Sequence, residues 1–224
     1  MNVLITGFPA GPWATNCWIL APSPNSECLI IDPGYDSLEP IKDIVLAQNL
    51  KPVAALLTHG HIDHMWSVTP LADSYEIPAM IHDADRNLLS HPENAISDAG
   101  RDMIVQLGGK FQEPQQVTTF SGDADISLLG FKFSILHLPG HTPGSIGFFL
   151  NEHETFFSGD VLFQAGIGRT DLPGGDIANM QGSIQKLFRV LPDSTSVLCG
   201  HGNSTTIGDE RKSNPYIQDW IKHD

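Results

Sequence analysis

One segment of the sequence concentrates side chains that bind metal ions. It reads His59-Gly60-His61-Ile62-Asp63-His64 and directly follows a short apolar run. Imidazole nitrogens and carboxylate oxygens are zinc ligands, and a catalytic zinc site keeps one position open for water. Because side chains alternate along an extended segment, His59 and His61 point the same way. Asp63 and His64 come where the chain turns into a helix, so they could face a second metal ion.

Three further ligand candidates follow apolar runs in the second half of the chain. His141 lies in a turn-forming Pro-Gly-His-Thr-Pro-Gly segment, Asp160 follows Ser158-Gly159, and His201 lies between two glycines. Taken alone each signal is weak, because an Asp at a strand end is often a turn or cap residue. The ends of neighbouring strands meet at one edge of a sheet, however. Together the four segments therefore predict one site.

Short apolar runs alternate with segments of helical spacing, and these elements must position the site. We expect strands over residues 16–21, 28–32, 53–57, 79–82, 131–138, 145–150, 154–158 and 196–199. We expect helices over residues 37–48, 63–75, 177–191 and 207–224, the last with a break at Pro215. Residues 83–112 are mostly polar and are expected to be helical in part. Two runs of strands, each punctuated by helices, favour an α/β layered fold.

Composition excludes several classes of protein. The 224 residues are 41% apolar, enough for the core of one large domain or two small ones. The net charge of −14 argues against a nucleic-acid partner, which needs a basic face. Three cysteines cannot form a disulfide framework, which favours a reducing compartment. The N-terminus lacks a basic region, and no apolar stretch approaches a membrane span. We therefore predict a cytoplasmic protein with no membrane partner.

At this point the residues resemble the hydrolases of the metallo-β-lactamase fold. The resemblance runs from the N-terminal strands to His201, about nine tenths of the chain. It is closest to the glyoxalase II-like thioesterases that consist of the metal domain alone, because of the segment from Gly166 to Gly175 and the Gly200-His201-Gly202 turn. The resemblance implies an αββα four-layer sandwich and a single catalytic domain over residues 1–224.

The resemblance also implies two metal positions. His59, His61 and His141 would hold the first ion. Asp63, His64 and His201 would hold the second. Asp160 would bridge them together with a water or hydroxide. Imidazole and carboxylate ligands suit zinc, iron and manganese, and we expect two divalent ions, zinc foremost.

Hydrolysis is the chemistry expected of such a site. A bound zinc lowers the pKa of its water from 15.7 towards about 7, and two ions can also polarise a carbonyl group. The bridging hydroxide would attack, while Asp63 could orient it or take its proton. A thiol has a pKa near 8.5 and departs without a strong acid, which favours a thioester over an amide. We predict a small-molecule substrate, an S-2-hydroxyacyl thioester such as a lactoyl thioester of a low-molecular-weight thiol.

Other residues carry weaker signals. Arg169 either binds a substrate carboxylate or pairs with Asp171 to hold its loop. Trp66 either lines the pocket or packs its helix. The remaining histidines match no ligand motif and are expected to be surface or packing residues: His82, His91, His137, His153 and His223. The three cysteines, Cys17, Cys28 and Cys199, are expected to be buried structural thiols.

Several alternatives remain open. Only 23 residues follow His201, so we expect the helical domain that grips glutathione in larger glyoxalase II enzymes to be absent. Persulfide dioxygenases also resemble this chain and hold one iron with residues that correspond to His59, His141 and Asp160. A β-lactamase is disfavoured because many place a Cys where Asp160 stands. RNA processing is disfavoured by the charge, and a binding module by ligands that leave room for solvent. The oligomeric state stays open.

Overall fold

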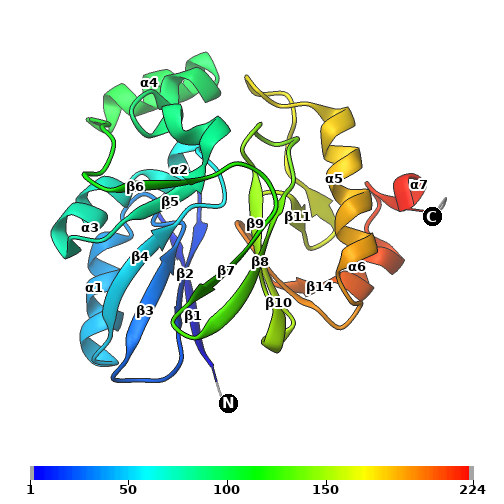
Figure 1. Ribbon diagram of the computed structural model, residues 1–224. Coiled ribbons are helices and arrows are strands. Elements are labelled where there is room, and N and C mark those ends of the chain that lie inside the picture. Colours follow the sequence, from blue (N-terminus) through cyan, green and yellow to red (C-terminus); the bar gives the residue numbers. More distant parts are fainter. Residues whose placement is uncertain (1–2, 222–224) are drawn as a thin grey trace.

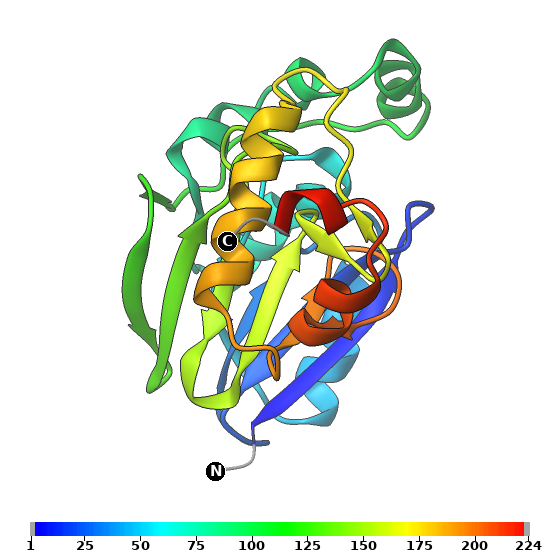
Figure 2. The same ribbon diagram turned by 90° about the vertical axis from the view of Figure 1, so that its right-hand side faces the viewer.

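Two six-stranded sheets lie face to face at the centre of the protein, between outer layers of helices (Figure 1). The computed structural model describes residues 3–221. Helices α1 (Leu38–Ala47) and α3 (Val68–Tyr75) cover the outer face of the first sheet. Helices α5 (Ile177–Val190) and α6 (Ile207–Ser213) cover the second, as the turned view shows (Figure 2). This arrangement is the αββα sandwich expected from the sequence.

Each half of the chain builds one sheet. The first has the order β1-β2-β3-β4-β5-β6, with strands Leu4–Ala10, Thr15–Ala21, Glu27–Ile31, Lys51–Leu56, Ala79–His82 and Val117–Phe120. The second has the order β14-β13-β10-β9-β8-β7, with strands Thr205–Thr206, Ser196–Cys199, Thr155–Gly159, Ile146–Leu150, Phe131–His137 and Ala124–Leu128. A small hairpin, β11 (Leu162–Phe163) and β12 (Gly166–Ile167), stands apart.

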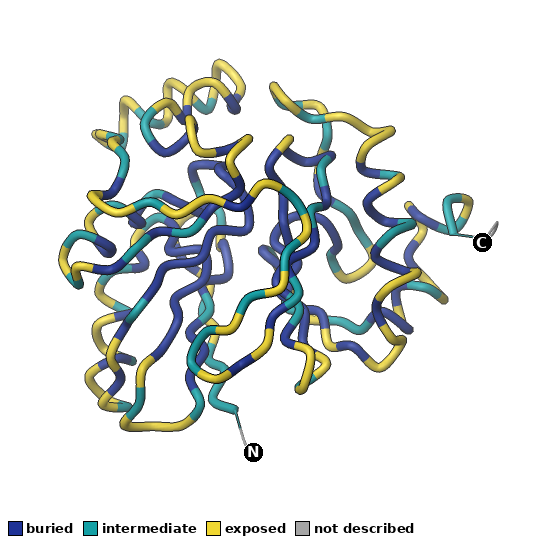
Figure 3. Tube along the Cα trace, in the orientation of Figure 1, coloured by how far each residue is buried: buried dark blue, intermediate teal, exposed yellow. Residues whose placement is uncertain are grey.

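The apolar core lies on both faces of each sheet. Along β3, Cys28 and Ile30 pack towards the helices, whereas Leu29 and Ile31 pack towards the second sheet. Successive side chains of a strand point to opposite faces, so a strand buried on both faces reads as a continuous apolar run. The central strands are accordingly the most deeply buried part of the chain (Figure 3).

The helix expected over residues 63–75 is interrupted. The structure has a short α2 (Ile62–Met65) and then α3, because the backbone N–H of Ser67 donates to the Pro33 carbonyl at 2.9 Å rather than to its own helix. The Ser67 hydroxyl also donates to the Gly34 carbonyl at 2.7 Å. The loop that follows β3 thus stops α2 immediately after the ligand segment. No spacing rule within the helix predicts this contact.

The remaining differences concern short elements. Residues 83–112 contain the 3₁₀ helices η1 (Asp83–Leu89) and η2 (Pro92–Ala95) and the helix α4 (Asp98–Gln106). The tail forms α6 and α7 (Gln218–Ile221), separated near Pro215 as expected, and the end of the expected helix lies outside the described residues. Six strands fall outside the strand ranges expected from the sequence: β1, β6, β7, β11, β12 and β14. A third 3₁₀ helix, η3 (Asn151–His153), joins β9 to β10. Within residues 3–221, no helix is both long and apolar enough to cross a membrane.

The contact between the sheets yields a stability prediction. Phe148 of β9 is fully buried, and its ring lies 6.3 Å from that of Phe120 in the opposite sheet. Phe148→Ala should lower the free energy of unfolding by about 3–5 kcal/mol, because it leaves a cavity between the sheets. Tyr216→Ala, at an exposed aromatic side chain, should change it by less than about 0.5 kcal/mol. Denaturant titrations measure both, and equal effects would contradict this account of the core.

Candidate metal centre

Seven predicted ligand side chains meet where strands of both sheets end. His59 follows β4, His61 precedes α2, and Asp63 and His64 lie in α2. From the second sheet, His141 follows β8, Asp160 follows β10 and His201 follows β13. Within residues 3–221 their donor atoms form three groups whose atoms lie within 4.8 Å of one another: His59 with His61 and His141, His59 with His64 and Asp160, and Asp63 with His64 and His201.

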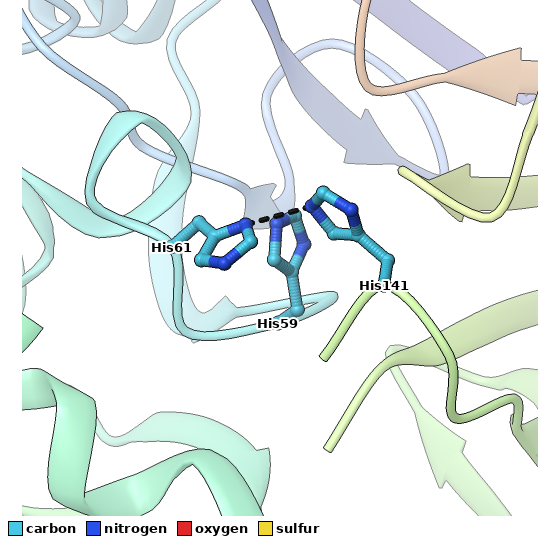
Figure 4. A group of neighbouring side chains, drawn as sticks. All are labelled: His59, His61 and His141. Atoms are coloured by element: carbon cyan, nitrogen blue, oxygen red, sulfur yellow. Dashed lines mark hydrogen bonds between the residues drawn. The ribbon is translucent and has the colours of Figure 1, made fainter. Parts of the chain in front are cut away.

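The first group consists of three imidazoles that face one another (Figure 4). Nδ1 of His61 lies 2.7 Å from Nε2 of His141, and the ring of His59 lies 4.7 Å from that of His141. Nε2 of His59 is buried with no hydrogen-bond partner among the described residues, as is Nε2 of His61. Buried nitrogens without partners are costly unless something binds them. The donor set therefore fits a metal ion.

Hydrogen bonds orient most of these rings. Nδ1 of His141 donates to the Arg169 carbonyl at 2.7 Å, and Nδ1 of His201 donates to the Trp13 carbonyl at 3.0 Å. When Nδ1 carries the proton, Nε2 of the neutral ring keeps a free lone pair for a metal. Two backbone carbonyls thus select the tautomer that a metal ligand requires.

Asp32 orients the rings of His64 and His59 in the same way, the second through Thr58. It is fully buried, and it accepts a hydrogen bond from Nδ1 of His64 at 2.9 Å. It also accepts bonds from the Thr58 amide at 2.8 Å and the Thr58 hydroxyl at 2.7 Å. Since that hydroxyl donates to Asp32, its oxygen can accept from Nδ1 of His59 at 3.1 Å. The sequence reading missed Asp32, although it too ends an apolar strand before a Pro-Gly pair.

The group of Asp63, His64 and His201, called the second group below, adjoins the first through Asp160. Nε2 of His201 lies 3.1 Å from Oδ2 of Asp63 and 3.3 Å from Nε2 of His64. Oδ2 of Asp160 lies 3.5 Å from Nε2 of both His141 and His201, and Oδ1 lies 3.2 Å from Nε2 of His64. Oδ1 is buried without a hydrogen-bond partner among the described residues. Asp160 is thus placed to contact ions in both groups.

Burial and charge divide the histidines into two kinds. Burial lowers the pKa of His59 well below its usual value and lowers that of His61 to about 3. Burial also opposes the charged forms of His64 and His201. For His64 the carboxylates of Asp160, Asp63 and Asp32 outweigh it and raise the pKa. For His201, hydrogen bonds to Asp160 and Asp63 raise the pKa to about 10. Without metal, the protons therefore reside on the second group.

Asp85 links the two ligand-bearing loops and was also missed. It lies in η1 and is fully buried. Its Oδ2 accepts bonds from the Gly60 amide at 2.8 Å and the Thr142 hydroxyl at 2.6 Å, and its Oδ1 accepts from the Gly144 amide at 2.8 Å. One carboxylate thus joins the His59–His64 segment to the His141 turn. In the sequence nothing distinguishes it from its neighbour Asp83.

A cleft of about 490 Å³ opens above the candidate ligands. Its lining includes His61, Asp63, His141, Asp160 and His201, and further side chains from the loop before β2, from α4 and from residues 163–172. Trp66 is not among the described lining residues. Its ring packs on Tyr35 and Phe111. Trp13, which sequence reasoning did not single out, lies in the cleft instead.

Arg169 and the histidines outside the candidate ligand set differ in their contacts and burial. The Arg169 guanidinium pairs with both Asp171 oxygens at 2.6–2.7 Å, as one expectation held, and Arg169 also lines the cleft. His82 stacks on His137, with ring centroids 4.1 Å apart. His91 is exposed, His153 is partly buried, and His223 lies outside the described residues. The three cysteines are buried free thiols, as expected.

Comparison with known proteins places these residues in a family. The family model described as Metallo-beta-lactamase superfamily matches residues 10–201. An uncharacterized protein of Mycobacterium tuberculosis is 44% identical over 222 residues, covering 96% of this chain and 98% of that protein. The Haemophilus influenzae protein named hydroxyacylglutathione hydrolase GloC is 38% identical over 221 residues, covering 97% of this chain and 98% of that protein.

Solved structures agree with this placement. The crystal structure of the BLEG-1 B3 metallo-beta-lactamase is 36% identical, with a TM-score of 0.83, and covers 96% of this chain and 99% of that chain. The crystal structure of TTHA1623 in a di-iron-bound form is 32% identical, with a TM-score of 0.78, and covers 94% of this chain and 99% of that chain.

The Asp85 bridge makes a testable prediction. Asp85→Asn replaces an accepting oxygen by an amide nitrogen, which leaves a buried donor without a partner and loosens the two loops. We expect metal affinity to fall by about 10–100-fold with the fold retained. Chelator competition measures the affinity and circular dichroism the fold. Asp83→Asn, at a half-exposed carboxyl of the same 3₁₀ helix, should leave affinity unchanged. Unchanged affinity in Asp85→Asn would refute the bridging role.

Metal loading should release protons. Because the pKa values of His64 and His201 are raised, both rings are cationic near neutral pH and must lose about two protons to bind metal. His201 stabilises the metal-free fold fully below about pH 6.5, and this contribution is lost as the pH rises through about 10. Proton release from His201 of the folded protein should therefore persist at neutral pH and decline only as the pH rises through about 10.

Calorimetry in buffers of different ionisation enthalpy measures this release. His201→Ala should release about one proton fewer than the wild type. His91→Ala, at an exposed histidine that belongs to none of the three donor groups, should match the wild type. An unchanged release in His201→Ala, or a wild-type release that stays the same as the pH rises through about 10, would contradict the assignment of a proton to His201.

Proposed function

The chain belongs to the metallo-beta-lactamase superfamily, and on that premise we propose that it is a binuclear metal-dependent hydrolase that cleaves thioesters of a low-molecular-weight thiol. One observation carries the proposal: the donor atoms of seven side chains gather in three overlapping groups, and five of these side chains line a cleft. The similarity to the Haemophilus influenzae protein named hydroxyacylglutathione hydrolase GloC supports a thioester, with an S-2-hydroxyacyl group, as the substrate.

The ligand residues divide into two sets. His59, His61 and His141 would hold one divalent ion, and Asp63, His64 and His201 the other, with Asp160 shared. Bound there, the two ions would supply a nucleophile by lowering the pKa of water and would polarise the substrate carbonyl. We propose zinc, since imidazole and carboxylate suit it. Iron satisfies the same ligands, and the di-iron form of TTHA1623 makes it the first alternative.

The chain's own residues set the protonation of the site. Burial opposes the charged form of Asp63, but the charge of His64 and a hydrogen bond from His201 hold its pKa below its usual range. Asp63 is thus a carboxylate at neutral pH, and it lies at the cleft surface. There it can orient the attacking water and accept its proton. The Thr15 hydroxyl donates to Oδ2 of Asp63 at 3.0 Å and fixes that carboxylate.

The residues that line the cleft favour a leaving group that departs without protonation. Among the described residues that line it, none is a Lys, Tyr or Cys that could act as a general acid. An amide nitrogen must be protonated to depart, whereas a thiolate departs unassisted because its conjugate acid has a pKa near 8.5. This argument favours a thioester. Arg169 is proposed to contact the substrate from the rim while it remains paired with Asp171.

The setting of the enzyme forms part of the proposal. A small-molecule substrate fits a cleft of about 490 Å³. The net charge of −14 disfavours nucleic acid. Three buried free thiols support a reducing compartment such as the cytoplasm.

A panel of substrates tests the function. Metal-replete protein should hydrolyse an S-lactoyl thioester. A content of one iron with sulfite formed from a persulfide would instead support a dioxygenase, for which His59, His141 and Asp160 are the available ligands. Nitrocefin hydrolysis without thioester hydrolysis would support a lactamase, the activity named for the similar BLEG-1 structure.

Variants test the assignment of residues. His59→Ala and Asp160→Ala should each lower thioesterase kcat/KM by roughly 10³-fold, in line with the several kcal/mol that a catalytic metal supplies. Bound metal, measured by elemental analysis, should fall in both variants, while the thermal unfolding of the metal-free protein should still show a cooperative transition. His91→Ala is the matched control and should retain full activity. Full activity in His59→Ala would remove it from the site.

A further inference from the structure

The walls of the cleft are apolar above its metal-binding floor. The apolar lining includes Trp13, Phe163 and Leu172, together with Ile96 just before α4 and Met103 within it. The floor recognises the group that reacts. The walls meet whatever is attached to it, so the walls decide which substituents the substrate can carry.

The aromatic part of the wall is held in place. The ring of Trp13 lies 6.1 Å from that of Tyr35 and 6.3 Å from that of Trp66, in tilted or edge-on contacts. Its backbone carbonyl is fixed by His201. The ring of Phe163 lies 6.1 Å from the His201 ring. Trp13 and Phe163 are thus both held next to His201 by contacts that exist before any substrate binds.

The cations near the cleft are already paired. Arg169 is the one Lys or Arg among the described residues that line the cleft, and Asp171 engages its guanidinium through both oxygens. Arg101, the cation within α4, donates to the Asp98 carboxylate and to the Glu93 carbonyl, both at 3.1 Å. The ions proposed at the floor are engaged with the reacting group, so a carboxylate on the arm that entered between these walls would lose water and find no unpaired Lys or Arg, which is unfavourable.

From this arrangement we propose that the cleft selects thioesters whose arm beyond the reacting carbonyl is uncharged and apolar, and that Met103 is a specificity-determining residue. The inference rests on the proposed thioesterase function and narrows its substrate class. Apolar substituents gain free energy by covering the Trp13, Phe163 and Met103 surfaces. Thiols that carry carboxylates, such as glutathione, gain nothing there and are disfavoured.

Two thioesters with the same acyl group test the selection. S-lactoyl-N-acetylcysteamine has an uncharged thiol arm, and S-lactoylglutathione has an anionic one. Metal-replete wild-type protein should show a kcat/KM about tenfold or more higher for the uncharged substrate, the size of effect that apolar pocket contacts give.

Charge placed on the wall should reverse the preference. Met103→Lys puts a cation in the cleft, so kcat/KM should rise for S-lactoylglutathione and fall for S-lactoyl-N-acetylcysteamine, each by about fivefold. Met103 is 36% exposed, so the substitution should leave the fold intact. Val105→Lys is the matched control, because Val105 lies on the same helix, is 78% exposed and is not among the lining residues. It should change neither substrate's kcat/KM.

The outcomes separate this inference from the function on which it rests. Hydrolysis of neither thioester by metal-replete protein would overturn the thioesterase function and the inference with it. Hydrolysis of both with a preference for S-lactoylglutathione would overturn the inference alone. Equal shifts in Met103→Lys and Val105→Lys would remove Met103 as a specificity determinant, because the charge would then act through the general field of the protein.

Discussion

A ring nitrogen of this site offers its lone pair when the other nitrogen of the same imidazole gives its proton to an acceptor, and four of the five candidate imidazoles have such an acceptor. Asp32 meets this constraint for His64 directly and for His59 through Thr58. The Arg169 and Trp13 carbonyls meet it for His141 and His201. These acceptors come from loops far apart in the sequence. The geometry of the site therefore depends on how the loops are fastened together, more than on the ligand residues themselves.

The packing of the two sheets against each other holds the ligand-bearing loops together. Candidate ligands His59 to His64 follow strand β4 of the first sheet, and the other three follow strands of the second. The apolar layer between the sheets, with Phe120 against Phe148, sets the distance between the two sets. Asp85 then adds a local bond between the loops, since its carboxylate accepts from both sides. The packing of the two sheets and the hydrogen bonds of Asp85 therefore both set the distance between the ligand-bearing loops.

The charges at the floor and the apolar walls above it separate two tasks. Carboxylates and imidazoles occupy the floor, where divalent ions would balance the negative charge of Asp63 and Asp160. The walls carry few free charges, so they bear on which substituents enter. This separation explains why the strongly acidic composition of the chain says little about the charge of the substrate. The surface charge and the cleft charge are set by different residues.

The residues of the sequence indicated the candidate ligands and an α/β layered fold, and the family resemblance implied the four-layer sandwich. Residue type and position at strand ends are local signals, and continuous apolar runs identify strands buried on both faces. Only the tertiary structure decided the role of Asp32 and Asp85, which resemble other turn aspartates until their partners are known. It also ended α2 at Met65 through the contact of Ser67 with Pro33, brought Trp13 rather than Trp66 to the cleft, and realised the pairing of Arg169 with Asp171 that the sequence had left as one of two possibilities. Most of these are contacts between segments distant along the chain. Their partners depend on how the two sheets close on each other, which no local pattern encodes.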